Sequence, residues 1–210
     1  MACACFDGRR FAAIYRGLVS VLLLCAGCFA LQAQPSYSLI AMTNEWRYNQ
    51  GGTNLGVPWR GTNYVDASWP IGRGAFGYDT NATSLLSSQI ATPLTLSNAA
   101  NVKINTYYFR THFTLTKNPF DITVRITNLI DEGAVFYVNS NEVARVNMPA
   151  APATIAYLTT ASSSLDATYK TFDVPASALV RGDNLLAVEV HNSSAASPDI
   201  GFGLAATAWS

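Results

Sequence analysis

The sequence beyond position 106 alternates apolar and polar side chains with a period of two. In residues 107–116, Tyr107 and Phe109 fall on one face, while Arg110 and His112 fall on the other. Because successive side chains of a β-strand point to opposite sides of the sheet, this period predicts strands with one face on a core and the other toward water. The same alternation appears in residues 121–129, 142–148, 184–192 and 200–208.

Residues 133–139 differ because both of their faces are apolar, with Phe136 on one and Tyr137 on the other. This pattern predicts a central strand that is covered on both sides. A polar turn follows at 139–141, and residues 168–174 are a further strand candidate. No window of a dozen residues shows a 3.6-residue period, so the sequence predicts an all-β chain folded as an antiparallel β-sandwich.

Residues 1–33 have the pattern of a secretory signal peptide. Three arginines precede an apolar run at 18–30, which is too short to cross a bilayer, since that takes about 20 apolar residues. We expect cleavage after Ala33, which leaves residues 34–210 as a single mature domain. No later stretch is apolar enough to predict a membrane span, so we expect a secreted or periplasmic protein.

All four cysteines lie in this leader: Cys3, Cys5, Cys25 and Cys28. The mature chain is therefore expected to contain no disulfide, although it enters an oxidising compartment. Cys28 follows an Ala-Gly pair that resembles the end of a bacterial lipoprotein signal. Lipid anchoring through Cys28 is thus the alternative to a plain cleaved signal.

Charge excludes two classes of protein. Only 12% of the residues are charged, about half of the roughly 25% typical of soluble domains. The leader holds three Arg and one Asp of the 13 basic and 13 acidic residues, so the remainder carries a charge of −2. A disordered chain needs more charge and less apolar content, and a nucleic-acid binder needs a basic surplus to neutralise phosphates.

Residues 48–102 form a long stretch that is rich in Gly, Asn, Thr and Ser. Trp59, Trp69, Phe76 and Tyr78 are spaced through it. A loop of this length in a compact domain is usually functional or poorly ordered. The interspersed aromatic side chains favour an ordered excursion that packs on the sandwich.

Five segments carry a family resemblance, in this order: 67–72 (ASWPIG), 108–113 (YFRTHF), 131–139 (DEGAVFYVN), 142–149 (EVARVNMP) and 184–192 (NLLAVEVHN). They resemble the galactose-binding-like jelly-roll domains found in β-galactosidase-type glycosidases and as accessory modules of secreted bacterial proteins. The resemblance covers residues 38–209, nearly the whole of the expected mature chain. It implies a jelly-roll sandwich and a binding role, and this fold also serves purely structural roles. Ser140 stands where the family commonly has glycine.

Four polar residues of two strands are candidate ligand contacts. Arg110 and His112 share one face of their strand, and Glu189 and His191 share one face of theirs. If the strands are neighbours, the four side chains could bind a sugar hydroxyl, a carboxylate or a cation. The alternative is a cross-strand Arg110–Glu189 ion pair that holds the register, flanked by hydrogen-bonded histidines.

Aromatic side chains offer the broad apolar contact that a sugar ring requires. We expect Trp69, which lies in a family-like segment, to pack on the sandwich. Trp59 lies in the Gly-rich part of the excursion and is the better candidate for an exposed sugar platform. The alternative for Trp59 is also burial in the fold.

Metal and catalytic signals are weak. Asp131 and Glu132 precede a buried strand, but two adjacent carboxylates supply too few of the six to eight oxygens that calcium takes. The alternative is that Asp131 caps a turn and Glu132 is solvated. With His112 and His191 as its two histidines, the chain cannot build a three-His zinc site. Nucleophile elbows and phosphate loops are also absent from the sequence.

These observations predict a secreted, non-catalytic sandwich that binds carbohydrate or another extracellular polymer. The first alternative is a structural or adhesive module that docks a protein partner through a flat apolar patch beside Gly201 and Gly203. The second is a hydrolase with a carboxylate pair that sequence spacing does not reveal. No nucleic-acid partner, membrane span or cofactor is expected.

Overall fold

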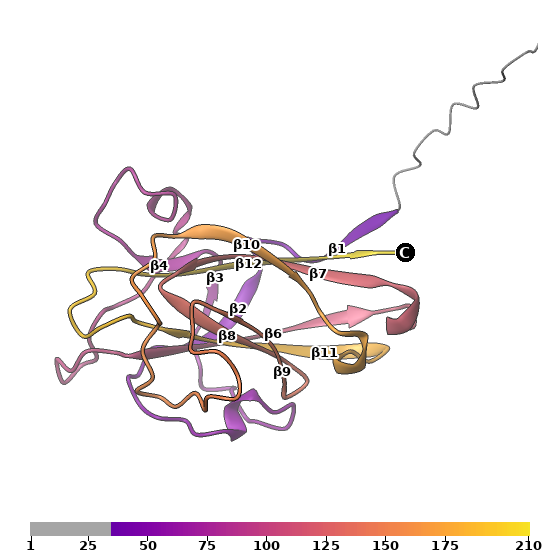
Figure 1. The fold of residues 1–210 in the computed structure, drawn as a ribbon, viewed down its shortest axis with the longest axis horizontal. Coiled ribbons are helices and arrows are strands. Elements are labelled where there is room, and N and C mark those ends of the chain that lie inside the picture. The colour runs from indigo at the N-terminus through magenta and orange to yellow at the C-terminus, as the bar shows by residue number, and fades with distance from the viewer. Residues whose placement is uncertain (1–34) are drawn as a thin grey trace, which may run out of the picture. The chain divides into compact units, whose positions relative to one another are not determined.

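A computed structural model describes residues 35–210, and residues 34–210 form one compact unit. The leader at 1–33, its cleavage site and Cys28 lie outside the described residues. Within the described part, no helix is long and apolar enough to cross a membrane. The chain folds as the predicted antiparallel β-sandwich, whose two sheets form two layers (Figure 1).

The first sheet has β12 at its centre, and β12 is paired along its length with β7. All pairs in this sheet are antiparallel except β4 with β5, which is parallel. Its strands are β10 (Thr168–Asp173), β7 (Thr123–Asp131), β12 (Ile200–Trp209), β4 (Phe76–Tyr78) and β5 (Thr92–Pro93), with β1 (Ser36–Ile40) also paired to β12.

The second sheet is antiparallel throughout and has β6 and β11 at its centre. Its order is β3 (Ile71–Arg73), β2 (Glu45–Asn49), β6 (Thr106–Leu115), β11 (Gly182–His191), β8 (Gly133–Val138) and β9 (Asn141–Val146). The connections contain four short 3-10 helices: η1 (Pro58–Arg60), η2 (Ser87–Gln89), η3 (Pro119–Asp121) and η4 (Ala176–Ala178).

The main core lies between the two sheets and is built on aromatic contacts. Phe109 of β6 packs against Phe202 of β12 with ring centroids 4.3 Å apart, and Phe76 packs against both. Trp46 meets Phe202 edge-on at 5.0 Å. Each of these side chains is fully buried, and burying one contributes about 1.5–3 kcal/mol to folding. The apolar side of the alternating strands therefore forms the core between the sheets, as the period of two predicted.

A smaller core covers the other face of the second sheet. Trp59 packs there on Tyr108 and Tyr137, together with Val135 and Leu185. The loop after β2 and the loop between β9 and β10 lie on this side, away from the first sheet (Figure 1). This layer explains why both faces of β8 are apolar. It also corrects the prediction that the polar face of β6 and β11 meets water.

The turn between β8 and β9 has Asn139 and Ser140 at φ values of 50° and 75°. Most L-residues are strained in this left-handed conformation, and Asn and Asp are strained less. Glycine adopts it readily because it has no Cβ. Asn139 tolerates the turn and holds it, because its amide group bonds Ala178 O, Asn184 Oδ1 and the Leu185 N–H. Ser140 makes no such compensating hydrogen bond among the bonds described for this turn.

We expect Ser140→Gly to raise the free energy of unfolding by about 0.5–1 kcal/mol, because glycine removes the left-handed strain at this position. Equilibrium urea denaturation measures the change. The matched variant Asn139→Gly should lower stability, since it loses three hydrogen bonds in the same turn. A Ser140→Gly variant no more stable than the parent would contradict this account of the turn.

Candidate functional site

The antiparallel register of β6 and β11 decides how the candidate residues lie. Tyr108 stands opposite Glu189, whereas Arg110 stands opposite Ala187 and His112 opposite Leu185. The predicted polar residues therefore share one face of the second sheet, but they are spread along it. They do not form a single cluster.

Arg110 is a buried anchor for the excursion. Its guanidinium lies 2.6 Å from Asp66 Oδ2 and donates hydrogen bonds to the carbonyls of Trp59 and Gly61. The alternative of an Arg110–Glu189 ion pair is therefore wrong, because the register offsets the two residues and Asp66 is closer. With its donors directed at these groups, Arg110 holds the loop around η1 on the sheet.

His112 lies farther along β6, at the exposed end of the same face. Its Nδ1 is 2.8 Å from Asp183 Oδ2, and both side chains are about half exposed or more. Ion pairs with this exposure contribute little to stability. The structure thus separates His112 from Glu189 and His191.

Glu189 and His191 do come together, in a buried chain of polar contacts. The Tyr137 hydroxyl donates to Glu189 Oε1 at 2.6 Å, and Glu189 Oε2 lies 3.4 Å from His191 Nε2. His191 Nδ1 lies 2.7 Å from the carbonyl oxygen of Thr159 and 3.1 Å from the Thr106 hydroxyl. This chain links three strands and the loop that precedes β10.

Trp59 is 1% exposed, so the prediction that it forms an open platform is wrong. The η1 turn and the Arg110 bond to its carbonyl hold the indole on the sheet, with ring centroids 4.7 Å from Tyr108 and 5.8 Å from Tyr137. Trp69 packs in the same layer, as expected. Trp59 nevertheless forms part of a pocket wall.

The pocket is a hollow of about 420 Å³ between this sheet face and the two covering loops. Its floor and walls include Trp59, Arg60, Tyr108, Tyr137, Arg145 and Glu189. Sites for small molecules are usually concave and combine apolar and aromatic side chains with a few fixed polar groups. The lining of this pocket holds residues of each kind. Residues 152–157, which follow the cis-Pro turn, form its outer rim.

Four of these wall residues were not predicted as site residues: Arg60, Tyr108, Tyr137 and Arg145. Tyr137 could have been found from the doubly apolar pattern of residues 133–139, since a tyrosine on the outer face of a covered strand requires a polar partner. Arg60 and Arg145 carry no comparable signal, because loop geometry brings them to the pocket.

Tyr108 and Tyr137 of the pocket stay neutral at physiological pH. Burial raises the pKa of Tyr137, and the adjacent Glu189 charge raises it further. Burial is also the main cause of the raised pKa of Tyr108. Their hydroxyl groups therefore remain uncharged hydrogen-bonding groups beside the apolar wall.

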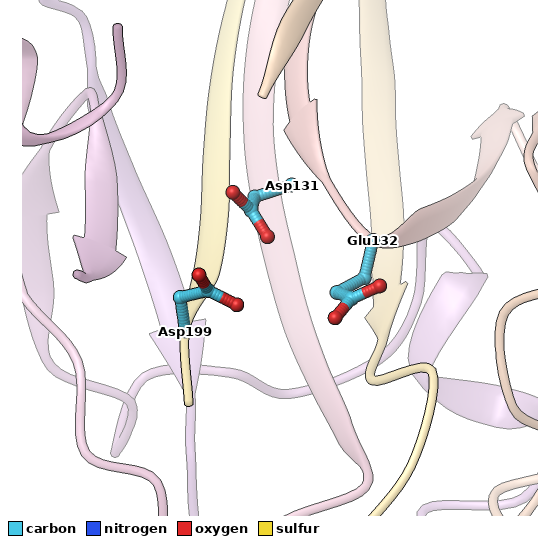
Figure 2. Close-up of side chains that lie close together, drawn as sticks. All are labelled: Asp131, Glu132 and Asp199. Atoms are coloured by element: carbon cyan, nitrogen blue, oxygen red, sulfur yellow. The ribbon is translucent and has the colours of Figure 1, made fainter. Parts of the chain in front are cut away.

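A second group of carboxylates lies at one end of the sandwich. Asp131, Glu132 and Asp199 each have a carboxylate oxygen that lies within 4.8 Å of the other two. Their side chains converge (Figure 2). Burial and the neighbouring charges of Asp199 and Glu132 raise the pKa of Asp131 to about 7. Asp131 and Asp199 also border a small cavity of about 260 Å³, together with Asp79 and Asp166.

Glu132 is buried, so the expectation that it is solvated is wrong. Its Oε1 accepts from the hydroxyl groups of Ser193 and Ser197, and its Oε2 accepts from the Leu165 N–H. Carboxylate oxygens are the ligands that a hard cation such as calcium prefers. Because both Glu132 oxygens already accept hydrogen bonds, the cluster leaves Asp131 and Asp199, which supply fewer than the six to eight oxygens that calcium takes.

The sequence matches no protein-family model, and no curated protein matches it. The fold does match solved structures. A Bacteroides uniformis β-glucuronidase 2, bound covalently to cyclophellitol-6-carboxylate aziridine, aligns over 83% of this chain with a TM-score of 0.53 and 14% identity. A β-glucuronidase from glycoside hydrolase family 2 aligns over 85% with a TM-score of 0.54 and 15% identity.

The chain spans only 18% of the length of each of these enzymes. At such low identity the likeness establishes the sandwich fold and nothing about activity. It agrees with the resemblance to glycosidase sandwich domains at the level of architecture.

Asp131 gives a pH-dependent prediction. The pKa of Asp131 is raised in the folded state from 3.8 to about 7. Its charged carboxylate therefore lowers the free energy of unfolding, an effect that is absent below pH 4 and grows as the pH rises to 7. We expect Asp131→Asn to raise the free energy of unfolding at pH 8 by on the order of 2 kcal/mol and to change it little at pH 4. Urea denaturation at the two pH values measures this.

The matched variant for this experiment is Asp121→Asn, which neutralises an exposed carboxylate. It should change stability little at either pH. A loss of stability on Asp131→Asn at pH 8 would overturn the prediction, because it would mean that the fold needs this carboxylate as an anion.

Proposed function

We propose that residues 34–210 form a non-catalytic, galactose-binding-like module of an exported protein, and that it binds carbohydrate in the pocket on the outer face of the second sheet. The observation that carries the proposal is the pocket itself, a hollow whose lining combines aromatic, aliphatic and charged residues. The family-like segments and the architecture of the glycosidase neighbours support the same proposal.

The pocket chemistry matches what a sugar requires. A pyranose ring presents apolar C–H faces and a rim of hydroxyl groups, so it needs flat apolar contacts and hydrogen-bonding groups together. Val57, Ile155 and Tyr157, which are exposed or half-buried in the pocket lining, supply the first. Arg60 supplies a charged donor for hydroxyl groups, and such hydrogen bonds are stronger than neutral ones.

The two pocket carboxylates favour binding over hydrolysis. Glu142 faces Arg145 with two hydrogen bonds, at 2.6 and 3.0 Å. Glu189 is already engaged by Tyr137 and His191. A glycosidase needs one carboxyl group free to give up a proton and another free to attack or activate water, and this arrangement supports the non-catalytic reading.

The apolar patch expected for the protein-docking alternative does not lie on the surface. Gly201 and Gly203 are buried on β12, where a Cβ on Gly201 would collide with Leu86 and one on Gly203 would meet Met42. The flat apolar patch expected beside these glycines is therefore covered. Export of the module remains part of our proposal and depends on the leader at 1–33.

The chain without residues 1–33 should bind glycans on an array, and titration calorimetry should confirm a hit. We expect Thr154→Trp, which fills the exposed rim of the pocket, to weaken that binding at least about tenfold, or 1.4 kcal/mol. Thr171→Trp places the same side chain on exposed β10 and should leave affinity unchanged. Absence of any glycan ligand, or equal affinity of the two variants, would exclude the pocket as a sugar site.

A further inference from the structure

The charged groups of the pocket can be counted pair by pair. Arg145 is committed: it binds Glu142 through two hydrogen bonds and donates to the carbonyls of Pro149 and Ala153. The guanidinium and the carboxylate neutralise each other, and the carbonyls take up further donors. This pair therefore adds no net charge to the pocket.

Glu189 is engaged by groups of the sheet itself. Its Oε1 accepts from the Tyr137 hydroxyl at 2.6 Å, and its Oε2 lies 3.4 Å from His191 Nε2. The Glu189 side chain is buried and lies beyond ion-pair distance of Arg60.

Arg60 differs from Arg145 because it has no ion-pair partner. Its guanidinium lies over the Tyr137 ring, with Cζ 4.6 Å from the ring centroid. No carboxylate in residues 35–210 lies within ion-pair distance of Arg60. Because an arginine stays protonated at all physiological pH values, the pocket lining presents a charged guanidinium that no carboxylate of the described residues pairs with.

We propose that the pocket selects an anionic saccharide, in which a carboxylate or sulfate on the sugar binds Arg60. This inference rests on the proposed function and adds the class of ligand. The guanidinium of Arg60 lies against the Tyr137 ring, and its fork of N–H donors suits a planar, bidentate partner such as a carboxylate. The sugar ring then packs against the apolar side chains of the pocket lining.

The contacts of the two carboxylates in the pocket lining favour an anionic ligand over a cationic one. Glu142 is bound by Arg145, and Glu189 is buried and accepts from the Tyr137 hydroxyl. A neutral sugar would leave Arg60 partly desolvated without a counter-charge. An anion supplies a counter-charge that no carboxylate within ion-pair distance of Arg60 provides.

The test uses the chain without residues 1–33 and matched probes: galactose, galacturonate and galactose 6-sulfate, with glucose, glucuronate and glucose 6-sulfate as a second series. Affinity is measured by titration calorimetry. We expect at least one acidic sugar to bind about tenfold or more tightly than its neutral counterpart at low salt. The uronate and sulfate arms show which anionic group the pocket accepts.

Arg60→Gln should abolish this preference while leaving the melting temperature nearly unchanged. The control Arg181→Gln removes one charge from an exposed turn outside the pocket lining and should keep the preference. If neutral and acidic sugars bind equally well and Thr154→Trp blocks both, the anionic inference is wrong and the sugar site stands. If Thr154→Trp leaves the binding of every probe unchanged, the proposed sugar site fails as well.

Discussion

The pairing of β6 with β11 is the constraint on which the rest of the structure depends. Its register runs unbroken from Gly182 with Leu115 to His191 with Thr106. Because both strands lie at the centre of their sheet, one face of this pair supplies Phe109 to the core between the sheets, and the other supplies the pocket floor. A shift of one residue would exchange the two faces and destroy both.

On the outer face of the second sheet, buried charged side chains have polar partners. Arg110 sits at 3% exposure and finds Asp66 and two loop carbonyls, so an otherwise costly buried charge fixes the covering loop. Glu189 likewise finds Tyr137 and His191. Arg60 departs from this pattern, because no carboxylate in residues 35–210 lies within ion-pair distance of it. Since Arg60 also lines the pocket, its guanidinium is the proposed contact for a charged ligand.

The sequence predicted the strands well because alternation reports local geometry directly. It placed Arg110 and His112 on one face of their strand and Glu189 and His191 on one face of theirs, and it identified residues 133–139 as doubly covered. It misjudged Trp59 and Glu132, since exposure depends on how distant loops fold back. The partners of those two residues, Tyr108 and Ser197 among them, lie tens of positions away in the chain.

The sequence by itself therefore determined the class of fold, the faces of the strands and the low, slightly acidic charge of residues 34–210. These follow from side-chain periodicity and composition, which are local or additive properties. Only the tertiary structure decided which charges are neutralised and which one, on Arg60, is left facing a pocket. Neutralisation depends on distances of a few ångströms between segments such as η1, β8 and the loop before β10, and sequence spacing does not encode those distances.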